Sequence, residues 1–288
     1  MPELPEVETV RRGLRELIIG KVVQTEQHDT EKGFPNTLAD VSTFLLGAII
    51  IDVRRRAKVL MIDLSTGYSL VIHLKMTGQL VFVGDTRFGA GHPNDSLIGE
   101  LPDKSTRVSL LFTDGSALYF NDQRKFGWMK LMPTAEIPNM KFMQKVGPEP
   151  LEDDFTPQQF MQRFQRRAKT NIKAALLDQS VIAGVGNIYA DEALWGAKLH
   201  PLRIVGSLTE EEFTLLYHEL RAVMKLAVQK GGSSNHTYVN AEGKRGSYMD
   251  FARVFRLEGT LCQRCGAIIE KTRVAGRGTH ICPVCQHL

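Results

Sequence analysis

The feature that most constrains this chain is the spacing of its four cysteines, which all lie close to the C-terminal end. They form two Cys-x-x-Cys pairs, Cys262/Cys265 and Cys282/Cys285, with sixteen residues between the pairs. Two such pairs can close a tetrahedral thiolate shell around one Zn²⁺, and a complete shell leaves no open position for catalysis. Two disulfides are the alternative, but they are disfavoured in the reducing cytoplasm, where we place the chain. The pattern therefore predicts one structural zinc ion in a small module whose folding depends on the metal.

The segment between the two cysteine pairs is basic and contains several glycines. Residues 270–279 predict a β-hairpin whose tip presents Arg277 between two glycines, a setting that suits contact with a phosphate or a DNA groove. From Arg253 onward six basic residues stand against two acidic ones, whereas the whole chain carries a net charge of only +4. A basic terminal module on a nearly neutral body indicates a polyanionic partner, most often nucleic acid. A solvated basic face is the alternative.

The first half of the chain reads as a series of short β-rich segments separated by turn pairs such as Thr66-Gly67 and Asp114-Gly115. This spacing predicts an antiparallel β-sandwich or barrel rather than a parallel α/β sheet. The predicted strands are Lys21–Glu26, Ile49–Val53, Val59–Leu64, Ser69–Leu74, Leu80–Val83, Arg107–Phe112, Ala117–Asn121 and Trp128–Met132.

The second half has a different character. Several prolines mark residues 134–150 as a linker, and helical spacing follows in Gln158–Arg167, Ile172–Leu177, Ile188–Trp195 and Thr209–Lys230. Residues 233–251 are polar and without regular period, and such a long loop is usually functional. We therefore predict an α+β multidomain chain: an N-terminal β-sandwich domain with flanking helices (1–133), the linker (134–150), a helical domain with the long loop (151–252) and the zinc finger (253–288).

The N-terminus carries the first candidate for chemistry. Removal of Met1 would leave Pro2 as a secondary amine beside Glu3, and an α-amino group has a pKa of about 7.7 to 8.0. Such an amine attacks carbonyl-like carbons and yields a cationic iminium, an electron sink for elimination. The alternative is an ordinary helix start, with Pro5 as the first helical residue and Glu6 and Glu8 as dipole charges.

A glycine-rich turn supplies a second candidate. The sequence AGVGNIYADE, residues 183–192, is a turn that opens a helix. Its backbone N–H groups and the Asn187 amide could hold a phosphate at the helix N-terminus, and Lys169, ahead of the preceding helix, could face the same anion. A tight interhelical turn without any ligand is the alternative.

A larger set of motifs resembles one known family. The segments PELPEVETVRRGL, RRAK, HLKMTG, NDQRKFG, IKAALLDQ, AGVGNIYADEALW and the four-cysteine finger occur in this order over essentially the whole chain. Together they resemble the bacterial formamidopyrimidine-DNA glycosylase family, which repairs oxidised purines in DNA. PELPE rather than PEGPE at the start favours this family over the related endonuclease VIII enzymes, which prefer oxidised pyrimidines.

The resemblance implies a helix-two-turn-helix domain in the second half, duplex DNA with oxidised bases as partner, and base excision followed by β,δ-elimination. It implies that Pro2 attacks C1′ of the damaged nucleotide, that Glu3 donates the proton for sugar-ring opening with Glu6 in support, and that Lys58 serves β-elimination. It further implies that residues 233–251 cover the flipped base. Arg277 would serve δ-elimination, and the implied DNA-contacting residues are Lys169, Asn187, Met76, Arg124 and Phe126.

Composition alone gives Met76 and Phe126 as core residues, and only the resemblance makes them wedges that fill the gap left by a flipped base. His73 is expected to be structural. Where the family has a K-H-x-H segment, this chain has Ser105 in place of a DNA-contacting histidine, and Arg107 could compensate with charge. An apparent insertion at residues 87–99 predicts a longer loop. The ranking of lesions is therefore less determined than the type of reaction.

Other classes of protein are excluded or remain open. The most apolar stretch, residues 44–53, is too short to span a bilayer, and an apolar signal-peptide region is missing from the start. We expect a cytoplasmic, nucleoid-associated monomer that does not engage membranes. An endonuclease VIII-like pyrimidine glycosylase and a non-catalytic zinc-finger DNA-binding protein remain alternatives.

Overall fold

The structure is a computed structural model that describes residues 1–233 and 247–288. These residues form two compact units. The first unit comprises residues 1–144 together with the chain around 230–233, and the second comprises 145–229 and 248–288. The division falls inside the linker expected at 134–150, but residues 230–233 group with the first unit rather than with the helical domain. Most of the long loop expected at 233–251 lies outside the described residues. No helix of the described chain is long and apolar enough to cross a membrane.

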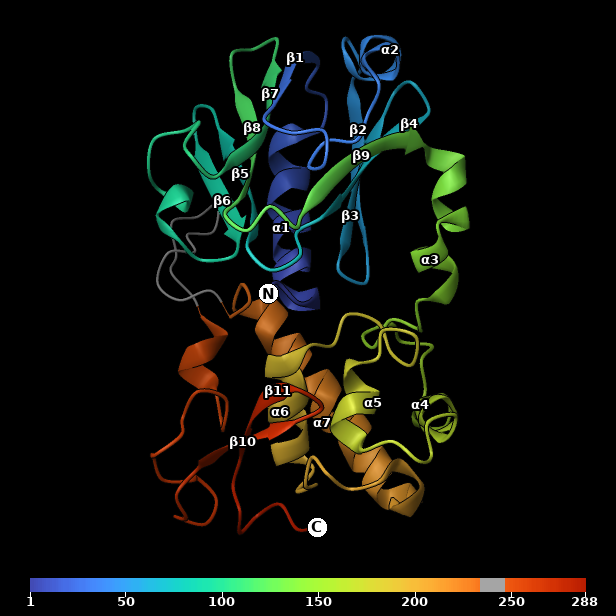
Figure 1. Ribbon diagram of the computed structural model, residues 1–288, viewed down its shortest axis with the longest axis vertical. Helices are drawn as coiled ribbons and strands as arrows, with labels where there is room; N and C mark the ends of the chain where they lie inside the picture. The colour runs from blue at the N-terminus through green and yellow to red at the C-terminus, as the bar shows by residue number, and fades with distance from the viewer. Residues whose placement is uncertain (234–246) are drawn as a thin grey trace. The chain divides into compact units, whose positions relative to one another are not determined.

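The first unit contains two antiparallel sheets, as expected for a β-sandwich (Figure 1). The five-stranded sheet has the order β1-β7-β8-β5-β6, and the four-stranded sheet has the order β2-β3-β4-β9. Buried aliphatic and aromatic side chains of both sheets form one hydrophobic cluster. The strands are β1 (Val23–His28), β2 (Ile50–Arg56), β3 (Val59–Leu64), β4 (Tyr68–His73), β5 (Gly78–Val83), β6 (Arg87–Gly91), β7 (Thr106–Phe112), β8 (Ala117–Asp122) and β9 (Trp128–Pro133).

Strand β6 corrects one sequence expectation. Residues 87–99 were expected to form only a lengthened loop, but Arg87–Gly91 pairs with β5, with Phe88 opposite Phe82, and a short 3-10 turn, η2 (Asp95–Leu97), follows. Two of its five residues are glycines, which are depleted in strands, so local preference does not predict a strand here. The pairing with β5 supplies the stabilisation that local preference lacks.

Helix α1 (Leu4–Ile18) packs against β2 of one sheet and β6 of the other. Val7, Val10 and Leu14 are completely buried on its inner face. Gly13 allows the close approach to β6, since a Cβ atom there would lie 2.2 Å from the Phe88 ring. The smaller elements of this unit are α2 (Leu38–Asp40), η1 (Val41–Leu45), η3 (Thr134–Asn139) and α3 (Lys141–Lys145).

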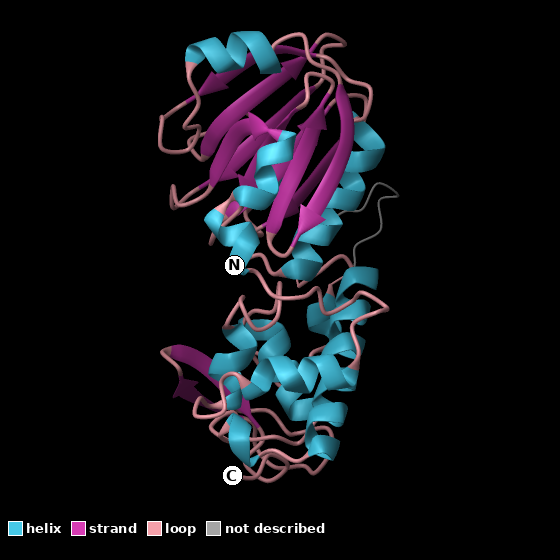
Figure 2. Cartoon of the chain, turned by 90° about the vertical axis from the view of Figure 1, so that its right-hand side faces the viewer, coloured by secondary structure: helices cyan, strands magenta, loops and turns pink. Residues whose placement is uncertain are grey.

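The second unit is mainly helical (Figure 2). The expected capping box is present in front of its longest helix, because Glu212 N donates to Thr209 Oγ1 (3.2 Å) and Thr209 N donates to Glu212 Oε2 (2.9 Å). A two-stranded hairpin lies in the zinc-finger region, as predicted. The elements are α4 (Pro157–Gln165), α5 (Ile172–Leu177), α6 (Asn187–Gly196), η4 (Val205–Ser207), α7 (Glu210–Gln229), η5 (Tyr248–Phe251), β10 (Glu270–Val274) and β11 (Arg277–Ile281).

Candidate active site

Pro2 and Glu3 lie directly before α1 and are both buried. Glu3 is the N-cap residue of the helix, and its backbone N–H donates to Glu6 Oε2 at 2.7 Å. Pro5 is therefore the second residue of the helix rather than the first. This capping arrangement holds the backbone that carries Pro2 in a defined direction.

Glu6 also joins the start of α1 to the chain that follows α7. Its Oε1 accepts a hydrogen bond from the backbone N–H of Ser233 at 2.7 Å. The preceding residue, Gly232, has a φ of +85°, and a Cβ atom there would lie 2.9 Å from Glu6 Oε1. Glycine is required at this position both by the backbone conformation and by the close approach.

Glu8 is not a simple helix-start charge, in contrast to the sequence expectation. Its carboxylate accepts hydrogen bonds from Arg11 Nη2 (2.8 Å), Arg12 Nε (2.9 Å) and Arg55 Nε (3.1 Å). Burial raises the pKa of this carboxyl, but the hydrogen bonds from Arg11 and Arg12 and the charge of Arg55 outweigh burial and lower the pKa to about 2. The side chain is therefore an ionised centre that ties α1 to β2.

The same contacts lead to Lys58. Arg55 donates to the carbonyl oxygen of Ala57 at 3.0 Å through Nη1, and Ala57 and Lys58 form the two-residue turn between β2 and β3. Ala57 has a φ of +52°, and Lys58 is only 5% exposed. Lys58 is thus held on a short, tied turn within the same unit as Pro2 and Glu3.

His73 lies at the end of β4, and the charge of Lys58 is one of the charges that lower its pKa. Burial and the charges of Lys75 and Lys58 lower the pKa of His73 to about 3, so its imidazole is neutral at physiological pH. Its Nδ1 accepts a hydrogen bond from the backbone N–H of Lys75 at 3.0 Å. This contact fixes the turn that leads into Met76, and it agrees with the structural assignment expected for His73.

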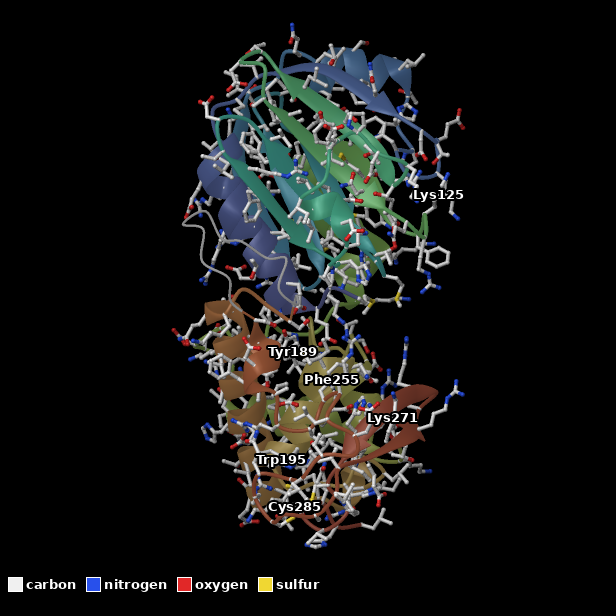
Figure 3. All side chains as sticks on the ribbon, turned by 90° about the vertical axis from the view of Figure 1, so that its left-hand side faces the viewer. Lys125, Tyr189, Trp195, Phe255, Lys271 and Cys285 are labelled. Atoms are coloured by element: carbon white, nitrogen blue, oxygen red, sulfur yellow. The ribbon has the colours of Figure 1, made fainter. Side chains whose placement is uncertain are left out.

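The three expected wedge residues lie on two loops of the first unit. Met76 is partly exposed, and Arg124 is exposed. Phe126 is 47% exposed, so it is not the core residue that composition alone suggests. The guanidinium of Arg124 lies over the Phe126 ring at 5.0 Å from its centroid. Lys125, which stands between Arg124 and Phe126 in the chain, is labelled in Figure 3.

One buried carboxylate organises both loops. Asp122, at the end of β8, is completely buried and accepts hydrogen bonds from the backbone N–H groups of Phe126 (2.8 Å) and Gly127 (2.7 Å) and from the hydroxyl of Thr77. The backbone N–H of Arg124 donates to Thr77 Oγ1 at 3.1 Å. Sequence reasoning missed Asp122, although it stands within the NDQRKFG motif. The available signal was a carboxylate directly ahead of a cationic and aromatic turn.

Backbone conformation distinguishes these loops as well. Ala57, Lys75, Lys125 and Ala275 all have φ between +51° and +54°, a region that is unfavourable for residues with a Cβ atom. Three of them stand immediately before Lys58, Met76 and Phe126, and Ala275 stands two residues before Arg277. A left-handed residue thus comes shortly before each of these four side chains, although Lys198 and Arg256 adopt the same conformation elsewhere in the described chain.

Ser105 and Arg107 do not lie as the sequence suggested, since both are buried. Ser105 Oγ donates to Asp103 Oδ1 at 2.7 Å. The Arg107 guanidinium donates to the Asp29 carboxylate and to the carbonyl oxygens of Lys104 and Asp122. Burial and these internal acceptors replace the direct DNA contact expected of Ser105 and Arg107, and Arg107 supports the end of β8.

In the second unit, Asn187 is the first residue of α6, after a glycine turn whose Gly184 has a φ of +77°. Its Nδ2 donates to the carbonyl oxygen of Gly278 at 2.9 Å. Because only the amide nitrogen can donate to a carbonyl, this bond settles the orientation of the amide. Lys169 is exposed in the turn between α4 and α5.

Arg277 is exposed and is the first residue of β11, paired with Val274 across the turn of the hairpin. Ala275 and Gly276 form this turn, both with positive φ. This is the tight two-residue hairpin turn that matches strand twist. The hairpin therefore presents the Arg277 guanidinium where the sequence placed it, close to the tip.

The four cysteines lie together, with all four Sγ atoms within 4.8 Å of one another. The region around Cys285 is labelled in Figure 3. Cys262 and Cys285 sulfurs are 3.9 Å apart, and Cys265 and Cys282 sulfurs are 3.4 Å apart. These separations exclude disulfides and are near the ~3.8 Å that follows from a tetrahedron with Zn–S bonds of about 2.3 Å. The set fits one structural zinc ion.

Three segments of the chain match known protein-family models. Residues 1–129 match the formamidopyrimidine-DNA glycosylase N-terminal domain, residues 146–239 match the formamidopyrimidine-DNA glycosylase H2TH domain, and residues 259–288 match a zinc finger found in FPG and IleRS. The chain is 41% identical to formamidopyrimidine-DNA glycosylase of Bacillus cereus, covering 99% of both proteins. It is 42% identical to that of Pediococcus pentosaceus, covering 100% of both.

Solved structures of proteins from the same family resemble the fold of this chain. A complex of Lactococcus lactis Fpg with DNA that contains an abasic site has a TM-score of 0.87 at 34% identity, covering 99% of this chain and 100% of that one. MutM in complex with DNA that contains carbocyclic 8-oxo-G has a TM-score of 0.86 at 33% identity, covering 100% of both chains. With its sandwich, its helical domain and its four-cysteine finger all matched, the chain belongs to the formamidopyrimidine-DNA glycosylase family and is a DNA-repair glycosylase.

Proposed function

We propose that this glycosylase excises oxidised purines, 8-oxoguanine and formamidopyrimidines, from duplex DNA and then cleaves the abasic strand by β,δ-elimination. The observation that carries the proposal is Pro2 directly in front of a helix whose N-cap is the buried Glu3. The structures of relatives in complex with DNA containing carbocyclic 8-oxo-G or N7-benzyl-Fapy-dG support this substrate class. We further propose that the enzyme acts as a monomer on DNA in the cytoplasm.

In the proposed reaction Pro2 supplies the nucleophile. Once Met1 is removed, the lone pair of the secondary amine attacks C1′, the glycosidic bond breaks, and the base leaves with the bonding electron pair and takes up the proton that the Pro2 nitrogen loses. Glu3 donates a proton to the sugar ring oxygen as the C1′–O4′ bond breaks, and an iminium joins Pro2 to C1′. The iminium acidifies the C2′–H bond, so that loss of the C2′ proton to a base expels the 3′ phosphate by β-elimination, and loss of the C4′ proton then expels the 5′ phosphate by δ-elimination.

Cations are required wherever a phosphate leaves. Lys58 is the candidate for the β-elimination step, because its short turn is tied through Arg55 to the helix that follows Pro2. Arg277 is the candidate for δ-elimination and for phosphate contact, together with Asn187 and Lys169. The zinc ion, when bound to Cys262, Cys265, Cys282 and Cys285, supplies structural order to the finger that carries Arg277.

The exposed loops of the first unit suit the gap left by a flipped base. Extruding a base costs a few kcal/mol of stacking and pairing. Insertion of Met76 and Phe126, with Arg124 stacked on the Phe126 ring, offsets part of that loss. In this proposal Asp122 keeps the wedge in place by accepting from the Phe126 backbone N–H on one loop and from the Thr77 hydroxyl on the other.

The direct test is borohydride trapping on a duplex that contains 8-oxoguanine. The mature protein, with the loss of Met1 checked by mass spectrometry, should form one covalent protein–DNA complex. Pro2→Gly should lower the yield strongly, and a chain that retains Met1 should form none, because its Pro2 nitrogen is an amide. An equal yield from Pro2→Gly, or no complex from the mature protein, would refute the mechanism.

A parallel substrate separates the purine from the pyrimidine specificity. Excision of 8-oxoguanine should exceed excision of thymine glycol in matched duplexes under single-turnover conditions. Faster excision of thymine glycol would replace the proposed substrate class by that of the endonuclease VIII enzymes, whatever the outcome of the trapping.

A further inference from the structure

Two opposite charges are completely buried in the second unit, and the proposed chemistry does not use them. Lys173 on α5 and Asp191 on α6 are both 0% exposed, and Lys173 Nζ lies 2.6 Å from Asp191 Oδ1. Lysine and aspartate are almost never fully buried unless they are paired. A buried ion pair seldom adds net stability compared with apolar residues of similar volume, so its value has to be sought in what it orients.

The remaining hydrogen bonds of the pair lead to three successive residues of β11. Lys173 Nζ donates to the carbonyl oxygen of Gly278 (3.2 Å) and to Thr279 Oγ1 (2.7 Å). Asp191 Oδ2 accepts from the backbone N–H of His280 at 3.0 Å and lies 3.2 Å from its Nδ1. The pair therefore holds β11 against α5 and α6 (Figure 1) by directional bonds.

The outer strand of the hairpin adds little burial to this anchoring. This strand, β10, is exposed from Glu270 to Arg273, and only Val274 is buried there. The first residue of β11 is Arg277, and the next carbonyl, that of Gly278, accepts from both Lys173 and Asn187. The Gly278 carbonyl thus links the buried pair to Asn187 and to the residue next to Arg277, which are two of the three groups that we propose for phosphate contact.

We propose that Lys173 and Asp191 are positioning residues that hold Arg277 and Asn187 in one arrangement, so that both can contact the DNA backbone at the same lesion. The proposal rests on the proposed function for the identity of the ligand. Lys173 and Asp191 are too deeply buried to touch DNA themselves, and they act through β11. A shift of the hairpin by about 1 Å would reduce a step that depends on Arg277 by up to about a hundredfold.

The test is Asp191→Asn, which keeps the shape of the side chain and removes its charge. We expect the borohydride-trapped complex to form on a duplex with a preformed abasic site, because Pro2 is untouched. The ratio of δ- to β-elimination product should fall by about tenfold or more, and affinity for a duplex with a non-cleavable abasic analogue should fall with it. The zinc content, measured by atomic absorption, should stay at one per chain.

A double-mutant cycle with Arg277→Ala provides the decisive comparison. If Asp191 acts through Arg277, then Asp191→Asn will change the product ratio of the Arg277→Ala protein no further, whereas independent sites give additive effects. Additive effects, or an unchanged ratio in Asp191→Asn alone, would overturn the proposal. Failure of the wild type to form a trapped complex would instead count against the proposed function, and the affinity measurement would still test the positioning.

Two variants guard against a general loss of stability. Leu216→Ala removes a completely buried side chain from α7 and should lower the melting temperature without changing the product ratio. The same fall in ratio in Leu216→Ala would show that Asp191 acts through stability alone. If Asp191→Asn does not fold, Thr279→Val removes the hydrogen bond from Lys173 without altering charge, together with the bond that Thr279 Oγ1 donates to the Arg277 carbonyl oxygen (3.1 Å). It should shift the ratio in the same direction, by about threefold or more, as expected for the loss of one or two hydrogen bonds; no shift would overturn the proposal.

Discussion

At the scale of single residues, the candidate site depends on buried carboxylates that never need to touch the substrate. Asp122 holds the wedge loops through the Phe126 and Gly127 amides and the Thr77 hydroxyl. Asp122→Asn can keep one acceptor oxygen for the Phe126 and Gly127 N–H groups, but it places a donor at the position that now accepts from the Thr77 hydroxyl, which therefore loses its acceptor. Losing a buried hydrogen bond in this way costs about 1–3 kcal/mol of stability.

We therefore expect Asp122→Asn to reduce single-turnover excision of 8-oxoguanine by about tenfold or more, since the wedge is no longer held in one place. Quenched-flow excision assays and thermal melts measure the two effects. Asp114→Asn is the matched control, because Asp114 holds a turn between β7 and β8 in a similar way, by accepting from Ser116 N at 3.0 Å. Equal excision by Asp122→Asn and wild type would contradict the assignment.

Glu8 leads to a prediction about pH. Its pKa in the folded protein is about 2, whereas a glutamate in an unfolded chain has a pKa of about 4.3. A carboxyl whose pKa is lowered by folding stabilises the protein above the unfolded pKa, and this contribution is lost as the pH falls through the folded pKa. The stabilisation is on the order of 2 kcal/mol and should disappear between about pH 4.5 and pH 2.

Glu8→Gln should accordingly be less stable than the wild type at pH 7, and the difference between the two should shrink as the pH falls to 2. Urea unfolding at a series of pH values measures this difference. Glu16→Gln on the exposed side of the same helix should show no such convergence. A difference between wild type and Glu8→Gln that stays constant with pH would exclude an ionised Glu8 as its source.

At the scale of elements, α1 approaches β6 closely at Gly13. Alanine in place of Gly13 would gain up to about 1 kcal/mol of helix propensity. Its Cβ atom would, however, lie 2.2 Å from the ring of Phe88, which is 1% exposed, and overpacking of this kind costs about 1–3 kcal/mol. Gly13→Ala should therefore lower the melting temperature, and Gly13→Ala combined with Phe88→Leu should recover part of the loss.

The strands and helices were predictable where local preference and tertiary packing agree. Eight of the strands and the four main helices follow from alternation, turn pairs and capping signals, such as Thr209 with Glu212. Strand β6 was missed because its glycines oppose the pairing that β5 imposes. The burial of Arg107 was missed for a similar reason, because its acceptors Asp29 and Asp122 come from distant parts of the chain.

The residues of the candidate site also separate into those that local sequence predicts and those that depend on distant partners. The four cysteines can be identified from their spacing alone, whereas Pro2 and Glu3 are candidates that their neighbours suggest and the family resemblance strengthens. The partners of Asp122 and Asp191 could not be predicted, because Asp122 accepts from a residue 45 positions away and Asp191 from one 89 positions away. Sequence suggests the groups that react, whereas the groups that position them become visible only in the folded chain.

At the scale of the whole molecule, the two units predict different responses to metal removal. The second unit contains the four-cysteine cluster, and Trp195, Val254 and Ile269 pack in one cluster with three of these cysteines. The first unit has a separate core. A zinc chelator should therefore release one zinc ion per chain and abolish tight binding to damaged duplex, while the β-sandwich retains its circular dichroism and its own melting transition.

Adding zinc back under reducing conditions should restore binding. Cys265→Ser offers a genetic counterpart, since it removes one ligand without altering the first unit. Damage-specific DNA binding that survives full removal of zinc would show that the finger is dispensable for recognition. Loss of the β-sandwich transition on chelation would show instead that the two units do not unfold separately.

The left-handed residues at the loop tips have a consequence for protein engineering. Replacing Ala57, Lys75, Lys125 or Ala275 by glycine would relieve about 1 kcal/mol of backbone strain at each position, although glycine also gives the unfolded chain more freedom. A library of variants selected only for heat resistance is therefore free to collect changes at these four tips. Selection on strand cleavage should oppose them, because each tip precedes a side chain that we propose for the repair reaction. Heat resistance and repair activity are therefore expected to compete at these four loop tips.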